Sequence, residues 1–208
     1  MKIFSNEEMQ KPMRKVVKRV EELGVDLKKY DGLEFYAREG DWQTVSYSDQ
    51  LASLHAWEID PEREKALRRN LPNAQIRIGN SYELACLPEY QKKFNFINFD
   101  NPQATFGCNN EYCEHFEALP LIENLIPDQG IVVFDVNYNP YNYKYNNVWR
   151  KRRDSFYKKT DTSRLSFEFI KSHYEDYFLK MGFVNKFSFI EDRHDGHFAY
   201  CVMKLNRK

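Results

Sequence analysis

Several features are scarce in this sequence of 208 residues. The four cysteines are too few for a disulfide scaffold in a chain of this length, so free thiols are expected at Cys86, Cys108, Cys113 and Cys201. No apolar run approaches the roughly 18 residues that a transmembrane helix requires. The first residues, MKIFSNEEMQKP, lack the apolar stretch of a signal peptide. These absences predict a cytoplasmic protein without a membrane partner.

Net charge is absent as well, because 31 Lys and Arg residues balance 31 Asp and Glu residues. No field of the whole molecule therefore favours nucleic acid or a membrane, and any such partner must meet a local patch. No Ser-His-Asp arrangement, phosphate P-loop or repeat is visible. The length and the 42% hydrophobic fraction suit one globular domain over residues 1–208, and nothing in the sequence indicates an oligomeric state.

Strand-like and helix-like segments alternate along the chain. An N-terminal helical arm (1–30) contains a helix over 7–23, with Gly24 as its stop. Strands are expected at 32–37, 53–60, 74–80, 94–100, 130–137, 183–193 and 197–206. Helices are expected at 45–52, 61–71, 111–126 and 166–181, and a short helix or turn at 81–87. The last two strands are joined around Asp195-Gly196, a strong hairpin signal.

This order predicts an α/β fold. Alternating strands and helices favour a doubly wound, mostly parallel seven-stranded sheet with helices on both faces and a C-terminal antiparallel β-hairpin. Ligands of such sheets bind outside the carboxyl ends of the strands, where the strand order reverses. Glu34, Glu58, Gly79 and Asp100 all fall at the carboxyl ends of consecutive expected strands. A carboxylate there can accept hydrogen bonds from two ribose hydroxyls, and glycine lets the backbone approach a ligand.

At these positions the sequence resembles the class I S-adenosylmethionine (SAM)-dependent methyltransferases, over about residues 30–206. The stretch LEFYAREGD stands where the family has an acidic residue followed by a glycine-rich loop, and AWEIDPE stands where the family has its ribose-binding acid. Gly79-Asn80-Ser81 stands where the family has the segment that flanks adenine. Asp100-Asn101-Pro102-Gln103 stands where the family has the motif that faces the methyl group. The resemblance implies a methyltransferase that uses SAM as cofactor. The cofactor-binding residues it implies are Glu34, Ala37, Gly40, Glu58, Ile59, Asn80, Ser81 and Asp100.

The first loop departs from the family pattern. Tyr36 and Arg38 stand where two glycines are expected. If either position needs a positive φ, a bulky residue costs of the order of 1 kcal/mol or more. Arg38 either pairs with the carboxylate of SAM or blocks its site. The loop is therefore an adapted SAM loop, a loop that has lost or altered its cofactor, or part of another α/β fold.

The stretch INFDNPQATFG carries the candidate catalytic residues Asp100, Asn101 and Pro102. Amino-directed nucleic-acid methyltransferases have an Asp/Asn-Pro-Pro-aromatic motif here, which holds the target amino group while the ring stacks on a flipped-out base. Gln103 replaces the second proline and Ala104 the ring, although Phe106 is a nearby ring. The alternative is a strand end followed by an Asn-Pro turn.

Residues 138–163 are predicted to be a substrate-side insertion or lid, rich in tyrosine and in basic residues. Rings interleaved with cations over 138–159 are typical of contacts with single-stranded or loop nucleic acid. The alternatives are a lid over a small substrate, or a basic helix. The candidate substrate-binding residues are Tyr143, Tyr145, Trp149, Arg150 and Arg152, with Lys151 and Arg153 as further phosphate contacts.

No metal site is expected. The cysteines of Cys108-x4-Cys113-x-His115 are spaced more widely than those of most zinc sites, and Cys113 is expected to face the core of its helix. His194 and His197 flank the hairpin turn, where pairing across it is favoured over metal binding.

Two classes of function stay open. One is methyl transfer from SAM to an N or O acceptor on nucleic acid, a protein or a small molecule. The other is a noncatalytic binding module on the same fold, which the bulk and charge of Arg38 would explain.

Overall fold

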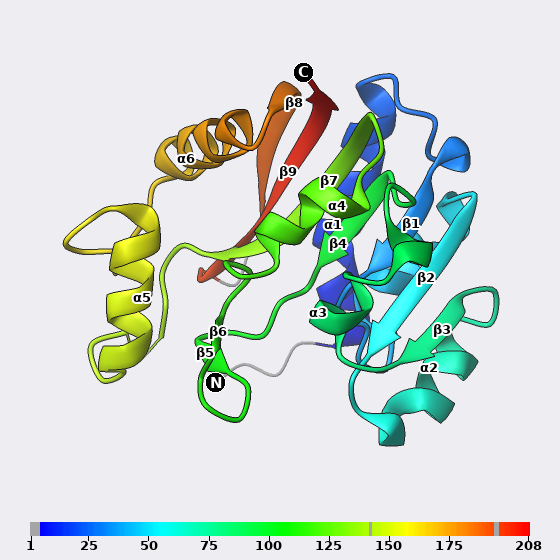
Figure 1. Ribbon diagram of the computed structural model, residues 1–208, viewed down its shortest axis with the longest axis horizontal. Coiled ribbons are helices and arrows are strands. Elements are labelled where there is room, and N and C mark those ends of the chain that lie inside the picture. Colours follow the sequence, from blue (N-terminus) through cyan, green and yellow to red (C-terminus); the bar gives the residue numbers. More distant parts are fainter. Residues whose placement is uncertain (1–4, 142, 194–195) are drawn as a thin grey trace.

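A seven-stranded sheet forms the centre of the computed structural model, which describes residues 5–141, 143–193 and 196–208 (Figure 1). Its order is β3-β2-β1-β4-β7-β9-β8. The strands are β1 (Asp31–Glu34), β2 (Ser53–Glu58), β3 (Gln75–Ile78), β4 (Phe96–Phe99), β7 (Gln129–Asn137), β8 (Phe183–Asp192) and β9 (Phe198–Arg207). Pairs from β3 to β7 are parallel, whereas β9 is antiparallel to both β7 and β8. The predicted fold class and C-terminal hairpin are confirmed.

The strand order reverses between β1 and β4. From β1 the chain moves outward through β2 and β3, then crosses back to β4 on the other side. The loops that follow β1 and β4 therefore part in opposite directions, which opens a crevice at the carboxyl edge of the sheet.

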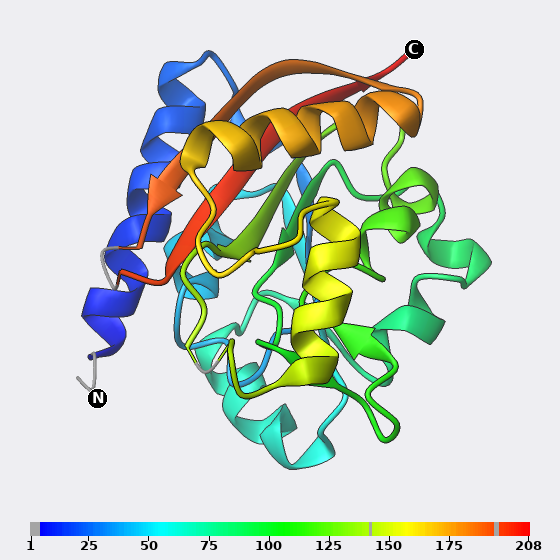
Figure 2. The same ribbon diagram turned by 90° about the vertical axis from the view of Figure 1, so that its left-hand side faces the viewer.

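Helices cover both faces of the sheet (Figure 2). One face carries α1 (Asn6–Glu22) and α2 (Glu64–Asn70), and the other carries α3 (Ser81–Leu84), α4 (Ile122–Leu125), α5 (Asn147–Tyr157) and α6 (Phe167–Lys180). Alternate residues of β7 serve the two cores: Ile131 and Val133 pack toward α1, whereas Val132 and Phe134 pack toward α6. Because β7 is buried on both faces, its sequence is almost continuously apolar.

Short 3-10 helices complete the connections. They are η1 (Leu27–Lys29), η2 (Thr44–Ser46), η3 (Ser48–Gln50), η4 (Pro61–Arg63), η5 (Pro88–Tyr90) and η6 (Leu119–Leu121). The short helix expected over 45–52 is thus the pair η2 and η3. Asp60 caps η4 by accepting from the Glu62 N–H, and Pro61 opens it, as the sequence indicated.

The helix predicted over 111–126 is wrong. Its first part forms β6 (Tyr112–Cys113), which pairs with β5 (Thr105–Phe106), and only α4 near its end is α-helical. Glu114 has a φ of 49°, which no right-handed helix contains, and Pro120 has no N–H to donate. The helical spacing of the apolar residues was misleading here. A short strand followed by turns buries the same apolar residues that a helix would have buried.

His194 and Asp195, between β8 and β9, lie outside the described residues, and so do the expected pairing of His194 with His197 and the expected turn at Asp195-Gly196. Among the described residues, no helix combines the length and the apolar character needed to cross a membrane.

Candidate active site

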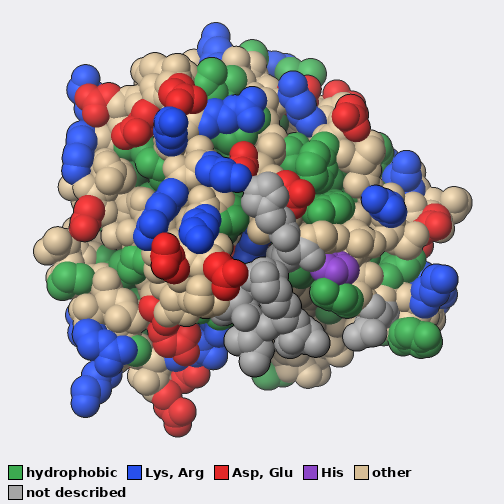
Figure 3. Space-filling view, turned by 180° about the vertical axis from the view of Figure 1, so that it is seen from behind, with side chains coloured by type: hydrophobic (Ala, Val, Ile, Leu, Met, Phe, Trp, Pro, Cys, Tyr) green, Lys and Arg blue, Asp and Glu red, His purple; other side chains and the backbone are tan. Residues whose placement is uncertain are grey.

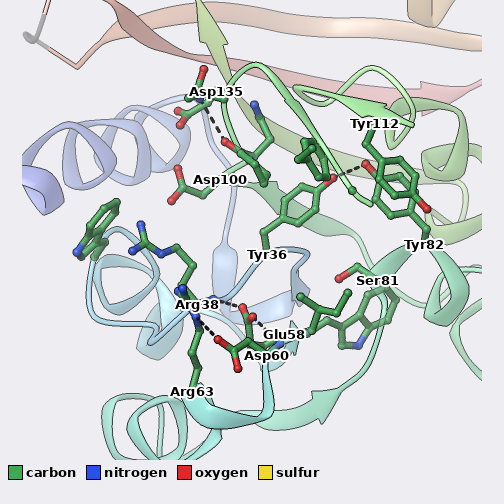
Figure 4. Close-up of a pocket in the computed structure, with 18 of the residues that line it drawn as sticks. Tyr36, Arg38, Glu58, Asp60, Arg63, Ser81, Tyr82, Asp100, Tyr112 and Asp135 are labelled. Atoms are coloured by element: carbon green, nitrogen blue, oxygen red, sulfur yellow. Dashed lines mark hydrogen bonds and ion pairs between the residues drawn. The ribbon is translucent and has the colours of Figure 1, made fainter. Parts of the chain in front are cut away.

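A pocket of about 1310 Å³ lies at the carboxyl edge of the sheet, around the reversal in strand order (Figure 4). Its walls come from the loops after β1, β2, β3 and β4, from the ends of β7 and β9, and from the start of α1. Ligand pockets in proteins typically enclose about 300–1,000 Å³. This pocket is therefore large enough for two ligands side by side.

The loop after β1 is a tight turn that keeps one strained residue. Ala37 N–H donates to the Trp57 carbonyl at 2.8 Å, and Gly40 N–H donates back to the Ala37 carbonyl at 2.9 Å. Between them Arg38 has a φ of 50°. One of the two positions where the family has glycine thus does require the left-handed region. An arginine there costs about 1–2 kcal/mol, which other contacts of the loop must offset.

Glu58 supplies one of those contacts. Its Oε2 accepts from the backbone N–H of Arg38 at 2.7 Å, and its Oε1 accepts from the backbone N–H of Asp60 at 2.9 Å. The side chain is almost fully buried and lines the pocket. A carboxylate has about four acceptor positions, so two remain for hydroxyl donors after these bonds are made. Ile59 beside it also lines the pocket and is 66% exposed.

Asn80 and Ser81 line the pocket after β3, but their side chains already have local partners. The Asn80 side-chain oxygen caps α3 by accepting from Tyr82 N–H at 3.0 Å. The Ser81 hydroxyl donates to the Phe35 carbonyl at 2.6 Å. Asn80 therefore stabilises the start of α3, and Ser81 ties α3 to the segment after β1 at the pocket wall.

An aromatic wall closes one side of the pocket (Figure 4). The Tyr36 and Tyr82 hydroxyls are hydrogen-bonded at 2.7 Å, and the Tyr82 ring stacks on Tyr112 with centroids 3.9 Å apart. Phe106 meets Tyr112 at 5.3 Å and the edge of Tyr36 at 6.2 Å. Burial raises the pKa of Tyr36 well above its usual value, so its hydroxyl stays protonated. Tyr36 can therefore occupy a position where the family has glycine, because its side chain packs into the aromatic wall.

Asp100 and Asn101 lie at the end of β4. The Asp100 carboxylate pairs with Arg193 at 3.5 Å, and the Arg193 guanidinium also pairs with Asp135 at the end of β7. In the orientation that its neighbours require, the Asn101 amide nitrogen donates to the main-chain carbonyls of Phe99 and Asp135, each at 3.2 Å. Asn101 thus fixes the turn, whereas the Asp100 side chain lines the pocket.

Gln103 explains why the second proline of the motif can be absent. Its side-chain nitrogen donates to the Asn101 carbonyl at 3.2 Å, and its oxygen accepts from Asn137 at 3.2 Å. Hydrogen bonds of the Gln103 side chain therefore stabilise the turn at the position where the family has the ring of a second proline. Pro102 also lines the pocket, and its backbone contributes no N–H donor there.

Three of the expected cofactor-binding residues do not line the pocket. Ala37 and Gly40 are buried in the turn, with Gly40 (φ 69°) packed against Leu67 and Leu71. Glu34 is fully buried beneath the loop and accepts hydrogen bonds from Tyr47, Thr44 and Asn98. Glu34 lies off the pocket because it ends β1 inside the core, and Ala37 and Gly40 lie off it because they are packed within the turn. Their contact with a cofactor stays a prediction.

Glu34 is an unusual core residue. Burial raises the pKa of its carboxyl from 4.5 to about 8, while the hydrogen bonds from Tyr47 and Asn98 act in the opposite direction. The carboxyl ties β1 to β4, because Asn98 donates to both of its oxygens at 3.1 and 2.9 Å. Its role in this structure is to join the two strands that flank the crevice.

The segment 138–163 also differs from expectation. Trp149 is buried, with its ring N–H donated to Glu114 at 2.7 Å, and the buried Tyr143 hydroxyl donates to Asp154 at 2.5 Å. Arg153 is fully buried and pairs with Glu114 at 2.5 Å. These side chains anchor α5 to the body of the protein. Neither ring is available to a base, and Arg153 is not available to a phosphate.

The other candidates of this segment pair within the protein or are exposed. Arg152 pairs with Glu117 at 2.5 Å, Arg150 donates to Asn147 at 2.8 Å, and Tyr145 is 89% exposed. None of the three lines the pocket. Successive residues of a helix turn by about 100°, so four consecutive cations cannot share one face.

Other pocket residues were not anticipated. Asp135 gave a weak signal, as an acid near the carboxyl end of an apolar strand. Arg193 comes directly after β8 and meets Asp100 only through the fold. Trp42 and Tyr112 gave no signal beyond being aromatic. Among the described residues, no group of three or more His, Cys, Asp or Glu side chains is placed to hold a metal ion. Cys113 is buried in β6 and Cys108 is exposed at the pocket.

Comparison with solved structures shows what this architecture is similar to. Trm1 from Pyrococcus horikoshii, solved with S-adenosyl-L-methionine, matches with a TM-score of 0.67 at 12% identity, over 99% of this chain and 56% of that one. TYW2 from M. jannaschii, solved with AdoMet, matches with a TM-score of 0.52 at 12% identity, over 94% and 77%. A Galdieria sulphuraria protein assigned provisionally as a sarcosine dimethylglycine methyltransferase matches with a TM-score of 0.56 at 11% identity, over 94% and 85%.

These likenesses establish that the chain has the fold of the class I SAM-dependent methyltransferases. No protein-family model and no curated protein matches the sequence. Identities this low show the fold alone, so the activity must be argued from the pocket.

Proposed function

We propose that this protein is a SAM-dependent methyltransferase that transfers a methyl group to an N or O acceptor. The observation that carries the proposal is Glu58, a nearly buried carboxylate at the end of β2 that lines the pocket and keeps acceptor capacity after binding Arg38 N–H and Asp60 N–H. Ribose hydroxyls are the donors such a group fits.

The residues around Glu58 fit the rest of the cofactor. Ile59, at 66% exposure, offers an apolar surface for the face of an adenine ring. Tyr36 leaves the loop toward Tyr82 rather than across the ribose-binding side (Figure 4). Bulk at the two glycine positions is thus accommodated by the aromatic wall and by Arg38, whose guanidinium lies over Trp42 at 4.0 Å.

Bound SAM would supply an electrophilic methyl group for direct displacement by the acceptor. The chain's own contribution is to bind and orient. Asp100 is the carboxylate placed to accept a hydrogen bond from an acceptor N–H or O–H, and the Pro102 carbonyl is a second candidate acceptor. Arg193 and the Asn101 amide hold the Asp100 turn in place. We assign Asp100 the catalytic role and Asn101 a positioning role.

The aromatic wall indicates a planar acceptor. Phe106 and Tyr112 line the same pocket as Asp100, so we expect a planar acceptor held at these rings to lie within reach of the Asp100 carboxylate. We infer that Phe106 takes the place of the aromatic that the Asn-Pro turn lacks. A nucleobase and a small aromatic molecule both meet this description, and a noncatalytic binding module is the alternative if the pocket does not take SAM.

Binding calorimetry with SAM and its demethylated product tests the proposal. Glu58→Gln should weaken SAM binding by about 1–3 kcal/mol, because hydroxyl donors lose a charged acceptor. Glu64→Gln is the matched control, since Glu64 pairs with Arg68 on α2, outside the pocket. No SAM binding by the wild type would leave the noncatalytic module. Equal affinity of folded Glu58→Gln would reject the ribose role.

Transfer itself is tested with labelled SAM against pools of RNA, DNA, protein and small molecules. Asp100→Asn should reduce transfer far more than it weakens SAM binding. Transfer at the wild-type rate would remove Asp100 from the mechanism.

A further inference from the structure

Five cations lie on one face of α1 and form what we name the α1 basic stripe. They recur at intervals of three, four, seven and eight residues, the spacing of a single helix face: Lys11, Arg14, Lys15, Lys18 and Arg19. All five are exposed, and Figure 3 shows Lys and Arg side chains gathered over this helix. The stripe gathers five cations in the middle of α1, between Glu7 and Glu8 at its start and Glu21 and Glu22 at its end, on a chain with no net charge.

The opposite face of α1 is not exposed. Met13, Val16, Val17 and Val20 are buried against the sheet. Amphipathic helices that bind membranes insert an apolar face, and here that face is already packed. The stripe therefore offers cations without an insertable surface, which favours a soluble polyanion over a lipid surface.

The amino-terminal end of α1, ahead of the stripe, lies at the pocket. Met9 lines the pocket, and Gln10 donates to the Asp41 carbonyl at 3.1 Å. Asn6 donates to the Asp41 carboxylate at 2.9 Å, so the first turn of α1 is fixed to the loop that carries Arg38 and Trp42. A polyanion lying along α1 would thus reach the pocket at the amino-terminal end of the helix.

One cation–ring pair and one pair of stacked rings line the pocket. The Arg38 guanidinium covers Trp42 at 4.0 Å, and the Tyr141 ring stacks on His197 at 3.5 Å with 28° between the planes. All four residues line the pocket, and Tyr141 is 56% exposed. Nucleic acid is the polyanion that uses both cations for phosphates and rings for bases.

We propose that single-stranded nucleic acid binds along the α1 basic stripe, with its phosphates on α1 and a base at the Tyr141 and Trp42 surfaces beside the pocket. The proposal rests on the proposed function, since it names the class of acceptor. It moves the nucleic-acid contact from α5 to α1. The present partners of the stripe do not prevent this, because the Lys15–Glu191 pair at 3.5 Å and the Lys18–Glu22 pair at 3.7 Å involve exposed lysines and are weak.

The test is a fluorescence anisotropy titration with short labelled single-stranded RNA and DNA at about 50 and about 200 mM salt. The α1 variant is Lys11→Gln, Arg14→Gln, Lys18→Gln. The matched control removes three charges from the region of α5: Lys144→Gln, Arg150→Gln, Lys151→Gln. Lys15 is kept because it pairs with Glu191, and Arg19 is kept because its guanidinium packs over the Phe189 ring at 4.4 Å.

The wild type should bind at low salt and weaken steeply at high salt. The α1 variant should bind at least about 10-fold more weakly, with the slope of log affinity against log salt reduced by about 2, for three lost phosphate contacts on a single strand. The α5 control should bind as the wild type does. The RNA and DNA arms identify which nucleic acid is preferred.

Three results would overturn the proposal: no binding by the wild type at low salt, equal binding by the α1 variant, or an equal loss in the α5 control. SAM calorimetry on the same three proteins separates the two proposals. Intact SAM binding without nucleic-acid binding refutes only the stripe, whereas loss of SAM binding in the wild type refutes the proposed function.

Discussion

Replacing Glu34 by glutamine should change how the stability of this protein depends on pH. Glu34 is fully buried between β1 and β4, and every hydrogen bond it makes comes from a donor on Tyr47, Thr44 or Asn98. Glutamine has the same shape without the charge. Its amide oxygen can keep the bond from Asn98, and the hydroxyls of Tyr47 and Thr44 can rotate to accept from its nitrogen.

The size of the effect follows from the shift in pKa. Burial raises the pKa of Glu34 from 4.5 to about 8. The folded state therefore holds this proton more tightly than the unfolded state does. The resulting stabilisation is fully present below about pH 4.5 and is lost as the pH rises toward 8. At about 1.36 kcal/mol for each pKa unit, the loss amounts to as much as about 5 kcal/mol.

Three histidines change the stability with pH in the opposite direction, so their effect must be distinguished from that of Glu34. Burial lowers the pKa of His55 and of His173 to about 4, and that of His115 to about 3. Their contributions are present above about pH 6.5 and are lost as the pH falls. The wild-type curve should thus have a maximum at mildly acidic pH, and only the difference between the two proteins isolates Glu34.

The assay is urea unfolding of wild type and Glu34→Gln from about pH 5 to about pH 9. At the acid end the two should be within about 1 kcal/mol, the cost of one rearranged hydrogen bond. Toward pH 9 the variant should become the more stable protein by several kcal/mol. A difference that does not change over this range would refute the reasoning. The series is extended down to about pH 3 to test the alternative: a wild type that gains on the variant as the pH rises toward about 4.5 would show that the hydrogen bonds, not burial, set the pKa.

Two further predictions concern residues whose roles the fold reassigned. Arg153→Ala should lower the free energy of unfolding by about 3–5 kcal/mol, because Glu114 is left buried without its partner; an effect as small as that of Arg150→Ala in the same denaturation experiment would contradict this. Gly40→Ala should destabilise by more than Gly24→Ala, because both have a positive φ but an added Cβ at Gly40 meets Leu67 and Leu71 at 2.8 Å whereas at Gly24 it meets open space. Calorimetry on folded Gly40→Ala should give wild-type SAM affinity, and a loss of affinity would return Gly40 to the cofactor site.

The alternation of strands and helices was determined by the sequence alone. Apolar runs such as residues 130–136 and turn signals such as Asp60-Pro61 act over a few residues, so they predict elements without knowledge of the fold. Because the carboxyl ends of parallel strands meet at one edge of the sheet, the expected strands also predicted that Glu58 and Asp100 lie at the same edge. Both residues line the pocket.

Tertiary structure alone decided which side chains reach the pocket. Glu34 and Glu58 are both the last residues of parallel strands, but only Glu58 lines the pocket, whereas Glu34 is fully buried in the core. The difference depends on how far each strand extends toward the edge of the sheet. Trp149 and Arg153 look like ligands of nucleic acid in sequence, yet burial against Glu114 makes them part of the core. Arg193 joins Asp100 across 93 residues, a contact that no local pattern encodes. Local propensity acts between neighbours in sequence, whereas the site is assembled from contacts between distant strands.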